Sequence, residues 1–202
     1  MFPKPKNGAS LLLSFRLKSR TVVIVGSSKL AASRAFTCLE ADAHVVVLGW
    51  GGLENACEEI RWRAEQGEVE WRSIEREARA WETNRSDGLH MTADEAALES
   101  VLLSFPSVLF VCITDTIISS GVNAVLTPRS KESATRLYEI ASRNHRIPTN
   151  TTDMPTLCDF SFPSAHRFRS PETGESTSLQ VSNYAAGDIF AFLTAYIPRL
   201  ES

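Results

Sequence analysis

The stretch TVVIVGSSKLAA, residues 21–32, decides the fold. Its first five residues, Thr21–Val25, form a β-branched run typical of a strand that is buried on both faces. Gly26 ends the run, and either of the two serines that follow can cap a helix over about residues 29–40. A buried strand that passes through a glycine turn into a helix is the usual first unit of a parallel α/β sheet.

The same alternation continues along the chain. We expect further strands at residues 45–48, 69–71, 108–113 and 149–152, and further helices at 53–66, 93–104 and 131–144. Residues 65–95 hold thirteen Asp, Glu or Arg, so outside the short strand and the start of the 93–104 helix they predict a solvated surface insertion. The predicted fold class is α/β, a Rossmann-like parallel sheet with helices on both faces.

The alternation of strands and helices ends after the last predicted strand. We expect a Rossmann-like domain over residues 1–152 and a small strand-and-helix unit over residues 153–202. The small unit would hold strands at 160–162 and 179–182 and a closing helix at 189–200. Because about fifty residues bury little surface alone, this unit is predicted to form a homodimer.

Composition excludes several classes of protein. The chain has 202 residues and a formal net charge of −3, so no nucleic-acid partner is expected. No apolar run approaches the ~20 residues of a membrane span, so no membrane partner is expected. The four cysteines form no CxxC pair, and no resident metal site is expected. Seven Lys or Arg precede the first acidic residue, which hints at a presequence, but the fold begins so early that we expect a cytoplasmic protein.

Two segments carry candidate chemistry. The turn Gly26-Ser27-Ser28 offers free backbone N–H groups to a pyrophosphate, although an ordinary strand–helix turn explains it equally well. The segment NTTDMPTLCDFSFP, residues 150–163, follows the last strand of the sheet, where parallel sheets open their binding crevice. Asp153 in this segment is either a general base or a turn-forming residue. The nearby Asp159 is expected to make a structural hydrogen bond.

This second segment resembles the motif NVADxPxLCDFxFP of the siroheme synthase family, the precorrin-2 dehydrogenases and sirohydrochlorin ferrochelatases. The start FRLKSRTVVIVG, residues 15–26, is similar to that family's FxLKGRxVLVVG. The resemblance covers about residues 8–183. The matching positions in the second segment are Asn150, Asp153, Pro155, Leu157, Cys158, Asp159, Phe160, Phe162 and Pro163.

The resemblance implies a function. Enzymes of this family oxidise precorrin-2 to sirohydrochlorin with NAD, and several insert ferrous iron, a substrate, into the tetrapyrrole. It implies Asp153 as the general base of both steps, with a tetrapyrrole and a divalent metal as partners. The implied cofactor-binding residues are Gly26, Ser27, Ser28, Lys29, Leu30, Thr114 and Asp115, and the implied substrate-binding residues are Asn150, His166 and Arg167. Further cationic candidates for the substrate carboxylates are Arg143, His145, Arg146 and Arg169.

The sequence also departs from the family. The family turn GGGxVA is replaced by GSSKLA at residues 26–31, and the family loop STxGxSP by SNYAAG at residues 182–187. Three alternatives therefore stay open: an NAD-dependent dehydrogenase with or without chelatase activity, a chelatase alone, and a non-catalytic tetrapyrrole- or nucleotide-binding relative.

Overall fold

The computed structural model describes residues 15–83, 90–116 and 129–162 with their side chains, and the backbone of residues 164–169 and 176–181. Its main sheet contains five parallel strands in the order β3-β2-β1-β4-β5. The strands are β1 Thr21–Val25, β2 His44–Gly49, β3 Val69–Ser73, β4 Val108–Ile113 and β5 Thr149–Thr151. The predicted Rossmann-like parallel sheet is therefore confirmed, and its strand order reverses between β1 and β4.

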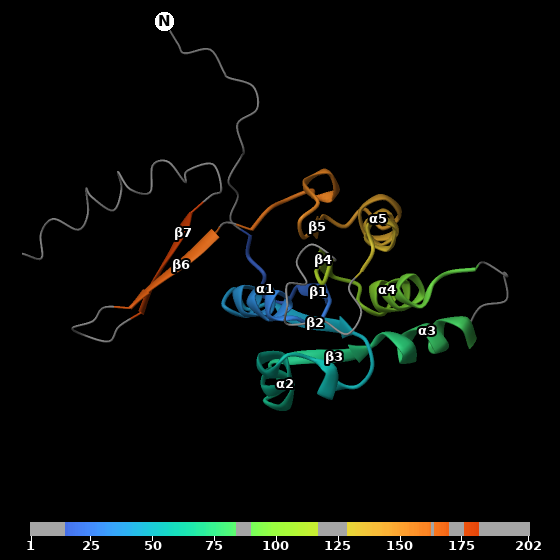
Figure 1. The fold of residues 1–202 in the computed structure, drawn as a ribbon, viewed down its shortest axis with the longest axis horizontal. Helices are drawn as coiled ribbons and strands as arrows, with labels where there is room; N and C mark the ends of the chain where they lie inside the picture. Colours follow the sequence, from blue (N-terminus) through green and yellow to red (C-terminus); the bar gives the residue numbers. More distant parts are fainter. Residues whose placement is uncertain (1–14, 84–89, 117–128, 163, 170–175, 182–202) are drawn as a thin grey trace, which may run out of the picture. The chain divides into compact units, whose positions relative to one another are not determined.

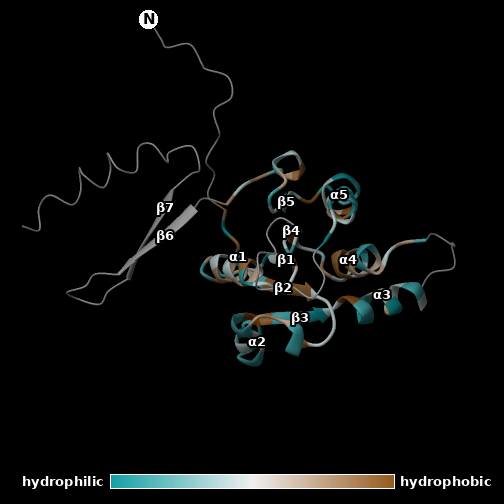
Figure 2. Ribbon diagram, in the orientation of Figure 1, coloured by the Kyte–Doolittle hydropathy of each residue, from teal (hydrophilic) through white to brown (hydrophobic). Residues whose placement is uncertain are grey.

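Side-chain alternation along β1 builds a core on each face of the sheet. Val23 and Val25 pack in one cluster with residues of the helices α3 Ile74–Thr83, α4 Ala93–Ser104 and α5 Lys131–Tyr138. Val22 and Ile24, also fully buried, point to the other face, where α1 Lys29–Leu39 and α2 Glu58–Glu65 lie (Figure 1). Hydrophobic residues accordingly make up most of β2, inside the sheet, whereas β3 at its edge is largely hydrophilic (Figure 2).

The charged stretch after β3 is a packed helix, so the predicted surface insertion is wrong for residues 74–83. Ile74 and Ala78 of α3 are buried against α4. The Glu77 carboxylate is buried too, and it accepts hydrogen bonds from Arg72 at 3.2 Å and Ser100 at 3.1 Å. Only one narrow face of α3 is apolar. The many charged residues on its other faces are the reason why the sequence does not predict a packed helix here.

Two predicted helices are interrupted. Residues 53–66 form a short 3₁₀ turn, η1 Leu53–Asn55, and then α2, because Cys57 between them is extended and donates its backbone N–H to Ser27 O at 2.9 Å. Residues 131–144 begin as α5 and end as a π turn, η2 Glu139–Asn144. The helix predicted at 93–104 has the predicted bounds, and a capping box of Thr92 and Glu95 begins it.

The end of the chain forms a second unit. Compact units span Met1–Asp159 and Phe160–Ser202, and the second contains the antiparallel strands β6 Ser164–Arg169 and β7 Ser176–Val181. The strand predicted at 160–162 is wrong, because these residues have no regular secondary structure. The strand predicted at 179–182 overlaps the end of β7, and the helix predicted at 189–200 lies outside the described residues. Among the described residues no helix is both long and apolar enough to span a membrane.

Candidate functional site

The candidate site lies at the carboxyl edge of the sheet, where β1, β4 and β5 end next to one another. β1 runs into the turn that holds Gly26, β4 into Thr114 and Asp115, and β5 into Thr152 and Asp153. Because strand order reverses between β1 and β4, the loops that follow these two strands diverge and leave a crevice for a ligand.

Gly26 is required by the geometry of the first turn. Its φ of +140° is rare for any residue with a side chain. A Cβ at this position would lie 2.0 Å from Thr114 Oγ1 and 2.8 Å from the carboxyl carbon of Asp115. The glycine therefore lets the ends of β1 and β4 approach closely.

The backbone donors of this turn are engaged by Asp115. Asp115 Oδ2 accepts the N–H of Ser27 at 2.6 Å, and Oδ1 accepts the N–H of Ser28 at 3.3 Å. Ser28 is the N-cap of α1, yet its own side chain forms no capping bond, and the first turn of α1 contains no acid. The carboxylate of Asp115, only 2% exposed, is thus the anion at the positive end of α1.

Asp115 is held in this position by a residue that the sequence alone did not single out. Arg129 donates its backbone N–H to Asp115 O at 2.7 Å and its Nη1 to Thr114 O at 3.3 Å. The guanidinium is buried and pairs with Asp94 of α4 at 3.3 Å. No local pattern marks Arg129 or Asp94, because they lie 35 positions apart and meet only in the fold.

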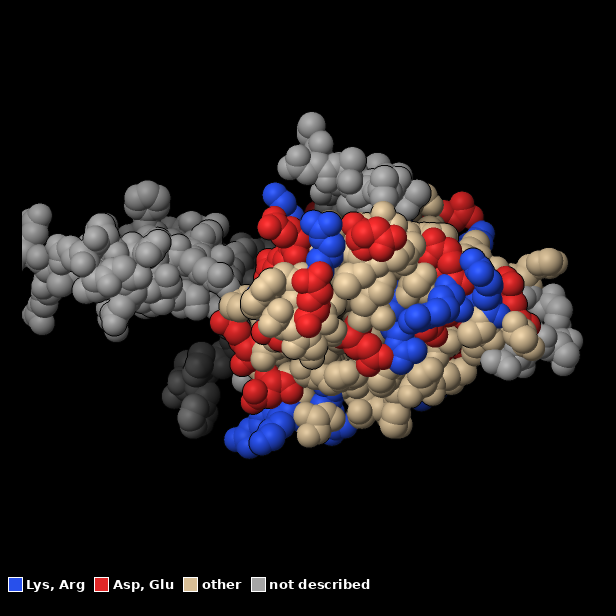
Figure 3. Space-filling view, turned by 90° about the horizontal axis from the view of Figure 1, so that it is seen from below, with Lys and Arg blue, Asp and Glu red and all other residues tan. Residues whose placement is uncertain are grey.

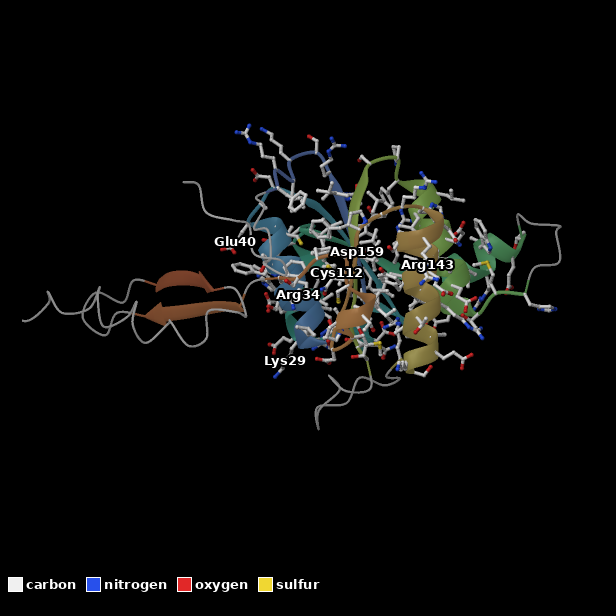
Figure 4. All side chains as sticks on the ribbon, turned by 90° about the horizontal axis from the view of Figure 1, so that it is seen from above. Lys29, Arg34, Glu40, Cys112, Arg143 and Asp159 are labelled. Carbon is white, nitrogen blue, oxygen red and sulfur yellow. The ribbon has the colours of Figure 1, made fainter. Side chains whose placement is uncertain are left out.

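The other residues predicted to bind the cofactor lie in this turn or at the start of α1. Ser27, Ser28 and Leu30 are half-buried, and Lys29 is exposed at the start of α1 (Figure 4). The thiol of Cys57 donates to Ser28 O at 3.5 Å, which fixes the turn from the α2 side. The structure thus brings Gly26, Ser27, Ser28, Lys29, Leu30, Thr114 and Asp115 to one edge of the sheet.

Asp153 lies exposed at the same edge of the sheet. Its side chain is exposed, and its backbone has a φ of 61°, a left-handed conformation that aspartate tolerates better than most residues. Oδ2 accepts a hydrogen bond of 3.4 Å from Thr116 Oγ1, the residue after Asp115. Asp115 and Asp153 therefore share a left-handed φ after neighbouring strands, but Asp115 is buried and Asp153 is exposed.

The residues after Asp153 fasten its turn to the sheet. The chain passes through a 3₁₀ turn, η3 Pro155–Leu157, and folds back so that Cys158 forms an antiparallel bridge with Asn150. The thiol of Cys158 donates to Thr151 O at 3.1 Å and to Met154 O at 3.3 Å. The turn that presents Asp153 is thereby closed at its base.

Asp159 completes this fastening. Its carboxylate accepts the backbone N–H of Thr149 at 2.9 Å and the hydroxyl of Tyr138 at 2.7 Å. Burial alone would raise the pKa of this carboxyl, but hydrogen bonds from Tyr138, Ser142 and Thr149 outweigh it and lower the pKa below its ordinary value. The structural hydrogen bond expected for Asp159 is therefore present.

The predicted substrate-binding residues belong to two different units of the chain. Asn150 is buried, and its side-chain amide donates to Cys158 Sγ at 3.5 Å. His166 and Arg167 lie on β6 in the second unit, where only the backbone is described. Arg169 is also on β6.

The remaining cationic candidates lie at the opposite end of the sheet. Arg143, His145 and Arg146 precede β5, so they are at its amino end, whereas Asp153 follows its carboxyl end. In Figure 4, Arg143 accordingly lies toward the end of the sheet that carries Glu40, away from Lys29. Arg143 pairs with Glu139 at 3.1 Å and His145 with Glu99 at 2.9 Å. These side chains do not line the edge that presents Asp153.

The surroundings of the four cysteines do not favour a reactive thiolate. Burial raises the pKa of Cys38 to about 12 against the opposing charge of Arg34, and burial raises the pKa of Cys112 as well. Burial also raises the pKa values of the half-exposed Cys57 and Cys158. Within the described residues, no three His, Cys, Asp or Glu side chains gather as a metal site would need.

Comparisons with known proteins agree with this architecture. The siroheme biosynthesis protein met8 of Schizosaccharomyces pombe is 31% identical over 162 residues, which is 79% of this chain and 46% of that protein. The chain therefore spans a little under half the length of this relative. The solved structure of SirC, precorrin-2 dehydrogenase, matches with a TM-score of 0.50 at 14% identity, over 92% of this chain and 67% of that one, and shows the same fold.

A family of proteins also matches most of the chain. Residues 13–164 match the family described as putative NAD(P)-binding, a range that runs from before β1 to the segment after Asp159. It includes the glycine turn, the β4 end with Asp115 and the turn of Asp153. The chain belongs to this putative NAD(P)-binding family, and the relative from Schizosaccharomyces pombe agrees with the resemblance to the siroheme synthase family.

Proposed function

We propose that this chain acts in siroheme biosynthesis, where it oxidises precorrin-2 to sirohydrochlorin with NAD and inserts ferrous iron into the product. The observation that carries the proposal is the exposed carboxylate of Asp153 on a fastened turn at the carboxyl edge of the sheet. The names of the two similar proteins, a siroheme biosynthesis protein and a precorrin-2 dehydrogenase, support it.

Asp153 has the surroundings that a general base requires. Both proposed reactions release protons from the macrocycle, one in the oxidation and two pyrrole N–H protons in the metal insertion. An exposed carboxylate can approach a bulky substrate and return its proton to water. The hydrogen bond from Thr116 orients Oδ2 and leaves Oδ1 for the proton.

The donor set at the start of α1 fits a phosphate group. The backbone N–H groups of Ser27 and Ser28 already hold an anion, the carboxylate of Asp115, and Lys29 next to them is exposed. The dinucleotide would be held by this turn once the Asp115 side chain rotates away from it. When bound, the nicotinamide ring supplies the hydride acceptor of the oxidation.

The position of Asp115 favours a second candidate function. A carboxylate on both turn donors competes with a pyrophosphate for the same sites and repels it. A chain in which this competition prevails would keep Asp153 and lose the oxidation. It would then be a chelatase alone or a non-catalytic tetrapyrrole-binding relative.

Two assays separate these functions. Purified protein is mixed with precorrin-2 and NAD⁺, and separately with sirohydrochlorin and Fe²⁺, while the macrocycle absorbance is followed. Turnover in both assays supports the full proposal, and turnover in the second alone supports the chelatase. Binding of sirohydrochlorin without turnover supports the non-catalytic relative, and no response of any kind refutes all three.

The proposed assembly is a homodimer formed by the second unit, in the cytoplasm. Light scattering at micromolar concentration tests the dimer, and a monomer under these conditions would refute it.

A further inference from the structure

Three charged residues are buried around the end of β4. On the face of the molecule seen in Figure 3, acidic and basic side chains are interspersed at the surface, where water weakens the interactions among them. Asp115, Arg129 and Asp94 are instead only 2%, 4% and 8% exposed. Two carboxylates and one guanidinium give this buried group a formal charge of −1, so the position of each carboxylate depends on how the guanidinium is shared between them.

Arg129 lies beside the residue whose carboxylate occupies the glycine turn. Its Nη1 donates to Thr114 O at 3.3 Å, and its backbone N–H donates to Asp115 O at 2.7 Å. The carbonyl oxygen of Thr114 lies in the same peptide plane as the Cα of Asp115. The guanidinium is therefore fixed next to Asp115, although it forms no described bond with the Asp115 carboxylate, which is directed to the turn.

One donor of this guanidinium is unused. An arginine side chain carries five N–H donors and remains charged. Nη1 donates to Thr114 O and Nη2 to Asp94 Oδ1 at 3.3 Å, whereas the buried Nε has no hydrogen-bond partner within the described part of the chain. A buried donor without a partner is unfavourable. A further acceptor that approaches the guanidinium would therefore be bound.

The Asp115 carboxylate is an acceptor that has to leave its position when a dinucleotide binds. It is held at the turn by the N–H groups of Ser27 and Ser28, at 2.6 and 3.3 Å, and by Thr114 Oγ1 at 3.3 Å. A pyrophosphate needs the same two N–H groups. Because Asp115 is buried, a carboxylate that left the turn without a new partner would be an unpaired buried charge, which is strongly unfavourable.

Asp94 determines how strongly the guanidinium attracts a second carboxylate. This acid lies at the start of α4, pairs with Arg129 at 3.3 Å and accepts a bond of 3.4 Å from Ser133 Oγ. Both distances exceed the ~2.7–2.9 Å that is usual for charged hydrogen bonds. Asp94 thus keeps the cation in place without using all of its donors.

We propose that Arg129 is a positioning residue that binds the Asp115 carboxylate when NAD binds, so that the backbone donors of the glycine turn become free for the pyrophosphate. This inference rests on the proposed dinucleotide-dependent function. The Asp115 side chain has two positions, one on the turn in the free protein and one on the guanidinium in the NAD complex. Arg129 stabilises the second position and thereby reduces the competition between carboxylate and pyrophosphate.

Isothermal titration calorimetry of the whole chain with NAD⁺ tests this role through two substitutions with opposite expected effects. Arg129→Lys keeps a charge for Asp94 and loses the unused Nε, so the Kd for NAD⁺ should rise about tenfold, the effect of one charged hydrogen bond. Asp94→Asn removes the competing charge, so Arg129 attracts Asp115 more strongly and the Kd should fall about threefold. If Arg129 served the fold alone, both variants would bind NAD⁺ less tightly.

A double variant separates positioning from a structural role. In the background of Asp115→Asn there is no carboxylate for the arginine to bind, so Arg129→Lys should no longer change the Kd. Arg136→Lys is the matched control, because Arg136 of α5 also pairs with an acid of α4, Glu95, at 3.3 Å. None of its described hydrogen bonds reaches β4 or the glycine turn, so its Kd should equal that of the wild type. Thermal unfolding reports whether each variant retains the fold.

The outcomes distinguish this inference from the function on which it rests. An unchanged Kd in Arg129→Lys, or the same rise with and without Asp115→Asn, overturns the inference and leaves the dinucleotide function intact. Binding of NAD⁺ by Asp115→Asn but not by the wild type shows that Arg129 does not relieve the competition, and it overturns the inference as well. If Arg129→Lys does not fold, Asp94→Asn decides, and equal or weaker binding in that variant overturns the inference. Failure of the wild type and of every folded variant to bind NAD⁺ overturns both the inference and the proposed oxidation.

Discussion

Asp115 and Ser27 lie 88 positions apart in the chain and are joined by a hydrogen bond of 2.6 Å from the Ser27 backbone N–H to Asp115 Oδ2. The bond links the end of β4 to the turn after β1, across the point where the strand order reverses. In a dinucleotide-binding fold, phosphate oxygens occupy this position. The chain therefore carries an internal anion where its cofactor is expected.

Replacing this anion should strengthen dinucleotide binding. Asp115→Asn keeps an oxygen that accepts the Ser27 N–H and removes the negative charge. A hydrogen bond to a charged group contributes about 1 kcal/mol more than a neutral one, so we expect the Kd of the dinucleotide to fall about fivefold, as measured by calorimetry. Glu40→Gln, at the far end of α1, removes the same charge and should leave the Kd unchanged (Figure 4). A Kd that stays constant in Asp115→Asn would show that the carboxylate does not compete.

Gly26→Ala should destabilise the fold more than an ordinary glycine substitution. The new methyl group would meet Thr114 Oγ1 at 2.0 Å, in addition to the backbone strain of a positive φ. Gly67→Ala is the matched control, because Gly67 has a φ of 73° and nothing within 4 Å of the added Cβ. We expect a loss of about 1 kcal/mol in Gly67→Ala and clearly more in Gly26→Ala, or about 2–4 °C of Tm per kcal/mol. Equal losses in the two variants would contradict the close contact.

Alkylation should separate the four thiols into two classes. Burial raises the pKa values of Cys38 and Cys112, and both side chains are 1% exposed, so iodoacetamide at pH 8 should leave them unmodified in the native state. Cys57 and Cys158 are half-exposed and should react slowly, since their pKa values are raised as well. Mass spectrometry of peptic peptides after a timed reaction measures both classes. Fast labelling of Cys112 would show that the core around β4 opens readily.

The sequence predicts the parts of the fold whose signal is local. The β-branched run of β1 and the apolar run of β4 are buried on both faces, so their composition alone identifies them as central strands. The helix α3 could not be recognised in this way, because Ile74 and Ala78 are its buried apolar residues among charged neighbours. Its stability comes from contact with α4, which begins ten residues after α3 ends.

The candidate site shows the same division. Asp153 and the closing residues Cys158 and Asp159 lie in one continuous motif, so resemblance to a family finds them together. The sequence also predicts the glycine turn, but it does not predict the hydrogen bond that Asp115 makes there or the contacts of Arg129 with Thr114 and Asp94. Contacts of this kind join residues tens of positions apart, and a single sequence holds no signal for them.

Acid should weaken the fold in part through Asp159. Burial opposes the charged form, but hydrogen bonds from Tyr138, Ser142 and Thr149 lower the pKa of this carboxyl below that of the unfolded chain. Its contribution is therefore fully present above the unfolded pKa, about 3.9, and is lost as the pH falls through the lower folded value. Asp159→Asn should flatten the dependence of Tm on pH below about pH 4, and Tyr138→Phe should flatten it less. Identical slopes in wild type and Asp159→Asn would argue against this contribution.

The most direct test of the proposed chemistry is Asp153→Asn. The side chain is exposed and its one described hydrogen bond, from Thr116, can be accepted by an amide oxygen, so we expect an unchanged Tm. The amide cannot take up a proton at neutral pH, and loss of a general base typically lowers kcat about 10²–10⁴-fold. Asp42→Asn is a close control, because Asp42 is also exposed and left-handed, with a φ of 62°, but follows α1 at the amino edge of the sheet. It should retain full activity in both macrocycle assays. If Asp153→Asn is as active as Asp42→Asn, another group removes the protons and Asp153 has only a structural role in its turn.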